Sequence, residues 1–290
     1  MKTVLKILAV SAVTTVFRIA IQMVMPQAEQ NVLEPSVFVT NGTLPIAFGV
    51  LALLVYGILA AAFLLFNRGI SGDRIVRGVK YGAALAFIWA VFLFEQLPHG
   101  TSFLLDNVLY ALVDGFALLI MGLLIGLLLT ERDNGGKTVR DAASIAGKGA
   151  PAKTAAWVSI TTVVFVLGRM LQYNVFGTYS SFEAKPVVTI LWCIGAGAVS
   201  AGVTIWLRNR AAATGRYRHP LAIACSLFAV NLAFFNFFMP LVLDVSILDL
   251  LVRTGVDIAA IALGLLIATS AVKGMKRTAI GSLPESGSGR

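Results

Sequence analysis

Eight long runs of apolar residues constrain what this chain can fold into. A helix that crosses a bilayer needs about 20 consecutive, mostly apolar residues. Runs of this kind lie at Val4–Met25, Leu44–Phe66, Gly78–Leu97, Phe103–Leu129, Ala155–Gln172, Pro186–Leu207, Pro220–Leu243 and Leu248–Val272. They do not alternate polar and apolar residues as the strands of a membrane barrel do, and lipid offers no partner to an open backbone. The runs therefore predict an all-α integral membrane protein with eight transmembrane helices.

The composition agrees with a lipid environment. Of the 290 residues, 58% are hydrophobic and 13% are charged, whereas soluble domains carry about 25% charged residues. The two cysteines, Cys193 and Cys225, lie inside apolar runs and lack metal-ligand spacing, so we expect them to be small packing residues.

Positive charge collects in alternate connections and so predicts the orientation. The basic connections, including both ends of the chain, hold Lys2, Lys6, Arg68, Arg74, Arg77, Lys80, Arg132, Lys137, Arg140, Lys148, Lys153, Arg208, Arg210, Arg216, Arg218, Lys273, Lys276 and Arg277. The opposite connections hold only Lys185 and Arg253, together with His99. Because basic loops stay in the cytoplasm, both termini are predicted to be cytoplasmic, in a bacterial or archaeal plasma membrane.

The net charge of +9 is largely this orientation signal. It suits anionic membrane lipids as partners and does not require nucleic acid. An alternative interpretation of the first run is a cleaved signal peptide. Arg18 interrupts that run, and the repeat described next needs it as a helix, so we favour a helix.

The last four runs repeat the first four at an offset of 141 to 143 residues. The matched positions are Pro45 with Pro186, Asn67 with Asn209, Arg74 with Arg216, Pro98 with Pro240, Asp106 with Asp249 and Asp114 with Asp257. Arg18 corresponds more loosely to Arg169. Four spans are an even number, so both halves enter the membrane in the same direction. We therefore expect two tandem, parallel four-helix repeats related by a pseudo-twofold axis along the membrane normal, in contrast to an inverted repeat.

The repeat divides the chain into four segments. Residues 1–130 form the first four-helix repeat, and residues 154–273 form the second. Residues 131–153 are rich in Gly, Ala and Lys and are expected to be a flexible cytoplasmic linker. Residues 274–290 are expected to be a polar, disordered cytoplasmic tail.

Four charges within the runs are expected to form two ion pairs. A charge inside a span costs about 2.5–3.5 kcal/mol on insertion scales and should face a partner inside the protein. Arg18 and Asp114 both lie roughly 10–12 Å below the outer end of their runs, at about 1.5 Å per residue. Arg169 and Asp257 are related in the same way. Either pair could simply fasten two helices, or it could form the floor of an outward-facing cavity or couple a proton to transport.

Gln22 and Gln172 follow the two arginines by about one helical turn. We expect each of them to hydrogen-bond to a neighbouring helix.

Glu95 breaks the symmetry of the repeat, because its counterpart is Asn236. Functional positions can diverge between repeats, so both residues are candidates for binding substrate or coupling to protons. His99 lies four residues after Glu95 and could share a proton or a metal with it. Two ligands are only half of a zinc site, so no metal or cofactor is predicted. The alternative for Glu95 is a place on a hydrated outer rim.

Small residues recur at helical spacing and predict close helix packing. Gly122 and Gly126 are repeated as Gly264 and Ala268, and similar steps occur at Gly57–Ala61 and Ala198–Gly202. Asp114 lies eight residues before Gly122, whereas Asp257 lies seven residues before Gly264. One residue rotates a helix by about 100°, so the two acids should point differently relative to their glycine faces.

No catalytic residue is predicted, because the chain lacks HExxH, GxSxG, P-loop and DDxxD patterns. The favoured function is a carrier, channel or lipid-translocating protein with a polar site open towards the outer side. The alternative is a membrane-embedded subunit or scaffold with a protein partner or a second copy as a homodimer. An intramembrane enzyme acting on lipid is the least supported interpretation.

Overall fold

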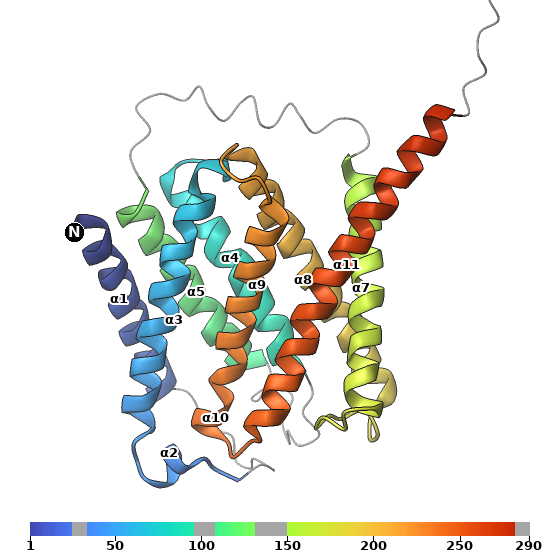
Figure 1. Cartoon of the computed structure of the whole chain (residues 1–290). Helices are drawn as coiled ribbons and strands as arrows, with labels where there is room; N and C mark the ends of the chain where they lie inside the picture. Colours follow the sequence, from blue (N-terminus) through green and yellow to red (C-terminus); the bar gives the residue numbers. More distant parts are fainter. Residues whose placement is uncertain (25–33, 96–107, 131–149, 282–290) are drawn as a thin grey trace, which may run out of the picture.

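The computed structural model describes residues 1–24, 34–95, 108–130 and 150–281, and its named elements are all helices (Figure 1). Eight of these helices are long and apolar enough to cross a membrane. They are α1 (Lys2–Val24), α3 (Leu44–Phe66), α4 (Arg74–Leu93), α5 (Tyr110–Leu128), α7 (Ala150–Asn174), α8 (Pro186–Ala213), α9 (Pro220–Phe237) and α11 (Ile247–Gly281). The predicted all-helical class with eight apolar helices is confirmed, and it indicates a membrane protein.

Three short helices lie in the connections: α2 (Val37–Thr40), η1 (Asn67–Gly69) and α10 (Met239–Val242). The ends of the long helices differ from the predicted spans for local reasons. Helix α4 begins four residues before Gly78, because the Asp73 side chain caps it by accepting a 2.9 Å hydrogen bond from the Val76 N–H. Helix α9 ends at Phe237, and α10, with Pro240 in its first turn, continues as a separate short helix.

The connections gather at two ends of the bundle (Figure 1). One end carries the N-terminus, η1 and the turn between α8 and α9. We call it the basic end, because Arg68 and Arg216 lie in these connections and Arg74 begins α4. The other end carries α2, α10 and the α7–α8 loop, residues 175–185. We call it the distal end. Helix α7 begins at Ala150 and α11 continues to Gly281; the rest of the predicted linker and tail lies outside the described residues.

Glycines bring α4 and α5 into backbone contact. A Cβ atom added at Gly78 would lie 2.1 Å from the Gly122 carbonyl oxygen, and one at Gly82 would lie 2.4 Å from the Leu118 carbonyl oxygen. These distances are far below van der Waals contact, so a side chain would force the two helices apart. The GxxxG step at Gly122 thus packs α5 against α4, as expected for packing inside the protein.

The matching glycine in α11 packs against a different helix. A Cβ atom at Gly264 would lie 2.8 Å from Cα of Thr161 in α7. The predicted step at Ala198–Gly202 does not form a close contact through its glycine. Among the described residues, nothing lies within 4 Å of a Cβ built at Gly202.

Helix α4 joins the two halves of the chain, because it packs against α8 and α9 as well as α5. The Trp89 indole N–H donates a 2.9 Å hydrogen bond to the side-chain oxygen of Asn231 in α9. The Trp192 indole N–H of α8 donates one of 2.7 Å to the Val91 carbonyl. At the distal end, the Asp244 N–H donates to the Glu34 carbonyl at 2.8 Å. Polar contacts therefore hold the halves together near the distal end of α4 and in the distal connections.

Candidate functional site

The predicted ion pair of the first half is confirmed. Arg18 of α1 donates to the Asp114 carboxylate of α5, and both side chains are largely buried. The Arg18 guanidinium also donates a 2.6 Å hydrogen bond to Gln22. Gln22 therefore bonds within its own helix, and the described residues show no bond from it to a neighbouring helix. Phe48 lies 5.5 Å from the Arg18 guanidinium carbon, measured to the ring centre.

The predicted ion pair of the second half is confirmed as well. Arg169 of α7 lies 2.5 Å from the Asp257 carboxylate of α11, and both residues are only 1% exposed. Gln172 donates 2.9 Å and 3.3 Å hydrogen bonds to Asp257 and to the Arg253 carbonyl. Here the glutamine does bridge to a neighbouring helix, as expected.

Asp114 and Asp257 point in different directions relative to the glycine faces of their helices, as the spacing predicts. In α5, Asp114 points to α1 while the Gly122 face meets α4. In α11, both Asp257 and Gly264 face α7. The one-residue difference in spacing, about 100° of rotation, thus changes which helix each glycine face contacts.

Glu95 connects the first half of the chain to the second-half ion pair. One of its carboxylate oxygens accepts from Arg253 at 2.7 Å and from Arg169 at 3.1 Å. Glu95, Arg169, Arg253 and Asp257 therefore form one group, which we call the central charge cluster. It contains two positive and two negative side chains, drawn from the end of α4, from α7 and from α11.

This placement corrects the expectation of a hydrated outer rim for Glu95, because its side chain is only 13% exposed. His99 lies outside the described residues. Within the described part of the chain, no group of three or more His, Cys, Asp or Glu side chains could hold a metal ion.

Aromatic rings enclose the Arg169 guanidinium. Its central carbon lies 4.7 Å from the ring centre of Trp192, 5.6 Å from that of Phe165 and 5.7 Å from that of Phe92. Rings at this distance attract a cation through their negative faces. The surroundings thus stabilise a charged Arg169 at a position where water is excluded. The three rings come from α8, α7 and α4, so a single sequence gave no signal that they would meet.

Asn236 does not join the central charge cluster. Its side-chain N–H donates a 2.7 Å hydrogen bond to the hydroxyl of Thr254, which links α9 to α11. The matched positions on either side of Glu95, Arg74 with Arg216 and Pro98 with Pro240, are both 142 residues apart. At this offset Glu95 aligns with Phe237 instead of Asn236. Glu95 therefore has no acidic counterpart in the second half in either alignment.

Arg253 belongs to the central charge cluster but was not among the candidate residues expected from the sequence. It was counted with the distal connections as a charge marking orientation, yet it is 4% exposed and contacts Glu95 inside the bundle. A signal was present in the spacing. Asp249, Arg253 and Asp257 follow one another at four-residue intervals, which places an arginine between two acids on one face of a helix.

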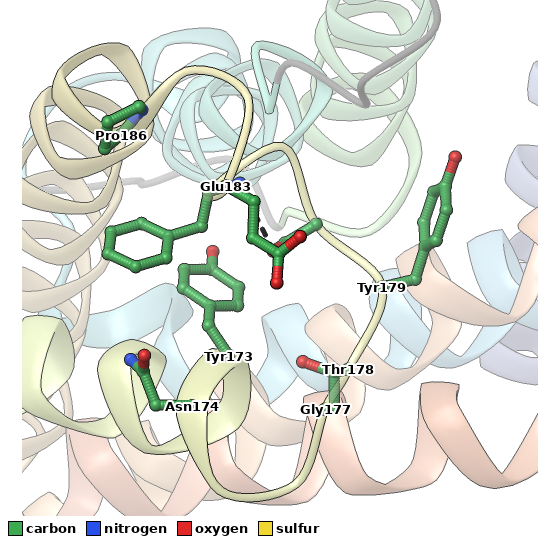
Figure 2. Close-up of a pocket in the computed structure, with 9 residues that line it drawn as sticks. Tyr173, Asn174, Gly177, Thr178, Tyr179, Glu183 and Pro186 are labelled. Carbon is green, nitrogen blue, oxygen red and sulfur yellow. Dashed lines mark hydrogen bonds between the residues drawn. The ribbon is translucent and has the colours of Figure 1, made fainter.

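Two cavities open at the distal end, next to the central charge cluster. The first, of about 420 Å³, lies in the α7–α8 loop (Figure 2). The second, of about 290 Å³, is lined by Arg253, Asp244 and Asp249. Gly177 and Tyr179 line both cavities, so the Tyr179 segment forms a wall between them. We call the first the loop cavity and the second the Arg253 cavity.

The backbone of Tyr179 is held by the same face of α11. Its N–H donates a 3.1 Å hydrogen bond to Asp249, and its carbonyl accepts one of 3.2 Å from Arg253. Arg253 therefore contacts the wall of both cavities and Glu95 at the same time. A ligand that moved the Tyr179 segment would disturb the bonds of Arg253.

The arrangement can change its ionic partners while each arginine stays close to a carboxylate. Arg169 is shared by two carboxylates, and Glu95 is shared by two arginines. Such exchange is not possible for Arg18, which has a single acidic partner among the described residues. Comparisons with known protein families, with curated proteins and with solved structures found no match to this chain.

Proposed function

We propose that this protein is a membrane carrier that receives its substrate at the distal end and uses the central charge cluster as a gate. The observation that carries the proposal is the double engagement of Arg253, which lines a distal cavity and also binds Glu95. A substrate or a proton that weakened the Arg253–Glu95 bond would loosen the contact between α4 and α11. The two halves could then move relative to each other.

The energetics favour exchange of partners over simple rupture. Breaking a buried ion pair by removing one member costs about 3–5 kcal/mol. If the ion pairs of Glu95 with both arginines break, the Arg169–Asp257 ion pair remains. Arg253 then lies one helical turn from the Asp249 carboxylate on the same helix. The charged groups are thus never left without a partner on the second half. The Arg18–Asp114 pair has no such alternative, so we assign it a fastening role between α1 and α5.

We further propose that the two halves are parallel repeats about an axis along the membrane normal. At the offset of 142 residues that relates Arg74 to Arg216, Trp89 corresponds to Asn231, and these two side chains are hydrogen-bonded to each other. Two equivalent positions can touch only close to the axis that relates them. The packing of α1 on α3 and α5, and of α7 on α8 and α11, also follows the same pattern.

The basic end is proposed to face the cytoplasm of a bacterial or archaeal cell, in accordance with the positive-inside rule. The distal end would then face outwards, with membrane lipids as neighbours of the apolar helix surfaces. Transport in this orientation amounts to uptake from the outer side.

The test is flux through purified protein in liposomes, with matched variants of the two carboxylates. Solid-supported-membrane electrophysiology detects charge movement without a label, so a panel of small amines, amino acids and inorganic cations can be applied in turn. We expect a current for at least one of them. Glu95→Gln should reduce the current about tenfold or more, because the gate loses its link to Arg253. Asp114→Asn should retain most of it per folded molecule.

Size-exclusion profiles before reconstitution show whether each variant is folded. Equal currents from wild type and Glu95→Gln would overturn the gating role. The absence of any current, together with a stoichiometric protein partner after mild solubilisation, would favour the membrane-embedded subunit instead. Movement of fluorescent lipids across the same vesicles would assign the carrier to lipid.

A further inference from the structure

The loop cavity has a lining that suits a positively charged ligand. Its walls include the Glu183 carboxylate and the rings of Tyr173, Phe182 and Tyr179. Its described lining residues include no lysine or arginine. Aromatic faces and a carboxylate both attract cations. At about 420 Å³, the cavity is within the usual range for small-molecule sites.

Glu183 is available for such a ligand. Its side chain is exposed, and it forms no salt bridge within the described part of the chain. Figure 2 shows its carboxylate turned into the space between Tyr173 and Tyr179. Tyr173 stacks on Phe182 with ring centres 5.6 Å apart, which fixes the aromatic wall below the acid.

Thr178 provides an independent sign that a ligand belongs here. It is 6% exposed, it lines the cavity, and no described residue forms a hydrogen bond with its buried hydroxyl. A buried hydroxyl without a partner costs roughly 1–3 kcal/mol, so a ligand that forms a hydrogen bond with it would recover this free energy. Figure 2 shows this hydroxyl on the same cavity as the Glu183 carboxylate.

The turn that presents Thr178 depends on Gly177. Gly177 has a φ of +62° just beyond the end of α7, in the left-handed region that glycine adopts at little cost. The chain reverses there, and the Thr178 N–H bonds back to the Gln172 carbonyl at 3.1 Å. The hydroxyl is therefore held in place before any ligand arrives.

From these contacts we infer that the loop cavity binds a primary ammonium group. An ammonium N–H would donate to the Glu183 carboxylate, a second N–H would donate to the Thr178 hydroxyl, and the Tyr173 and Tyr179 rings would flank the charge. A quaternary ammonium ion has no N–H, so the charge of Glu183 and the aromatic rings would attract it, but it could donate a hydrogen bond to neither Glu183 nor Thr178. The site should therefore prefer primary over quaternary amines.

The position of the cavity connects this ligand to the gate. Tyr179 forms a wall of the loop cavity, and its carbonyl is bound by Arg253 of the central charge cluster. An ammonium group that draws the Tyr179 segment towards Glu183 would lengthen that bond. This coupling step rests on the proposed carrier function, whereas the binding itself does not.

Titration calorimetry on the purified full chain in detergent tests the binding, with ethylammonium and tetramethylammonium chloride as probes. We expect ethylammonium to bind more tightly than tetramethylammonium. Glu183→Gln should weaken ethylammonium binding about tenfold or more, because it removes a charge-assisted hydrogen bond. Thr178→Val should weaken it several-fold and reduce the preference for ethylammonium, because the hydrogen bond to Glu183 remains. Glu34→Gln, an exposed acid at the same end that does not line the cavity, should bind like wild type.

Equal binding of the two probes, or unchanged binding in both cavity variants, would overturn the inference. Repeating the titration in nanodiscs distinguishes two sources of the ammonium group. Loss of ethylammonium binding in phosphatidylethanolamine discs, but not in phosphatidylcholine discs, assigns the site to a lipid headgroup. Retained binding in both assigns it to a free amine.

The outcomes for binding and transport are separable. If Glu95-dependent flux exists but neither probe binds, the carrier proposal stands and the ammonium site is wrong. If ethylammonium binds through Glu183 and Thr178 but no flux is found, the site stands and the carrier proposal is wrong.

Discussion

Loss of Arg169 should be rescued by removing one of its acidic partners and not by removing the other. In Arg169→Met, Glu95 keeps Arg253 at 2.7 Å, but Asp257 keeps only the neutral Gln172 at 2.9 Å. An unpaired buried carboxylate costs about 3–5 kcal/mol. Adding Asp257→Asn removes that charge and leaves one balanced pair. Adding Glu95→Gln instead breaks the Glu95–Arg253 bond and leaves Asp257 without its 2.5 Å partner Arg169, with Arg253 one helical turn away as the neighbouring cation.

Thermal unfolding in detergent gives the measurement. For a chain of this size, a loss of 1 kcal/mol lowers the midpoint by about 2–4 °C, so Arg169→Met should fall by on the order of 10 °C. The double variant with Asp257→Asn should recover most of this. A deficit of roughly 1–2 kcal/mol should remain, because the aromatic rings have lost their cation. The double variant with Glu95→Gln should be no more stable than the single variant.

The isolated pair of the first half is the internal control. Arg18→Met should be rescued by Asp114→Asn, since that pair shares no second acid among the described residues. Equal rescue of Arg169→Met by Glu95→Gln and by Asp257→Asn would refute the connectivity of the central charge cluster. The same result would remove the argument for exchange of partners.

Two further predictions concern helix packing and the contact between the halves. Gly122→Ala should lower the unfolding midpoint, because the new Cβ would lie 2.6 Å from a backbone carbonyl of α4. Gly202→Ala, where the described residues leave open space, should leave the midpoint unchanged or slightly higher. Trp89→Phe should cost about 1–3 kcal/mol, because the buried Asn231 side chain loses its 2.9 Å hydrogen bond from the indole. Double-mutant coupling with Asn231→Leu should recover part of this loss, and strict additivity of the two changes would count against the contact.

The ion pairs could be predicted because helix geometry is nearly rigid. The rise per residue fixes depth, so Arg18 and Asp114 could be placed at one level from the sequence alone. The spacing of Asp114 and Asp257 from their glycines likewise predicted a difference in facing that the structure contains. Periodicity and spacing describe single helices well. They say little about which helix of one half meets which helix of the other.

That limit explains what was missed. Glu95 contacts arginines on α7 and α11, and no local pattern links residues so far apart in the chain. Arg253 lies near a helix end, where a long basic side chain usually turns out to the interface, so its inward direction was not expected. The loop cavity depends on the path of residues 175–185 after Gly177. Loop paths follow from tertiary contacts that one sequence does not reveal.

The hydrogen bond between Trp89 and Asn231 bears on why the two halves share one chain. If the positions are equivalent, a dimer of identical halves would bring tryptophan to tryptophan, or asparagine to asparagine, at the axis. Two indoles offer only donors, so neither could bond to the other, whereas two asparagines could. The observed bond between an indole donor and an amide acceptor therefore requires halves that differ at this position. A single chain that carries both halves supplies this difference in every molecule.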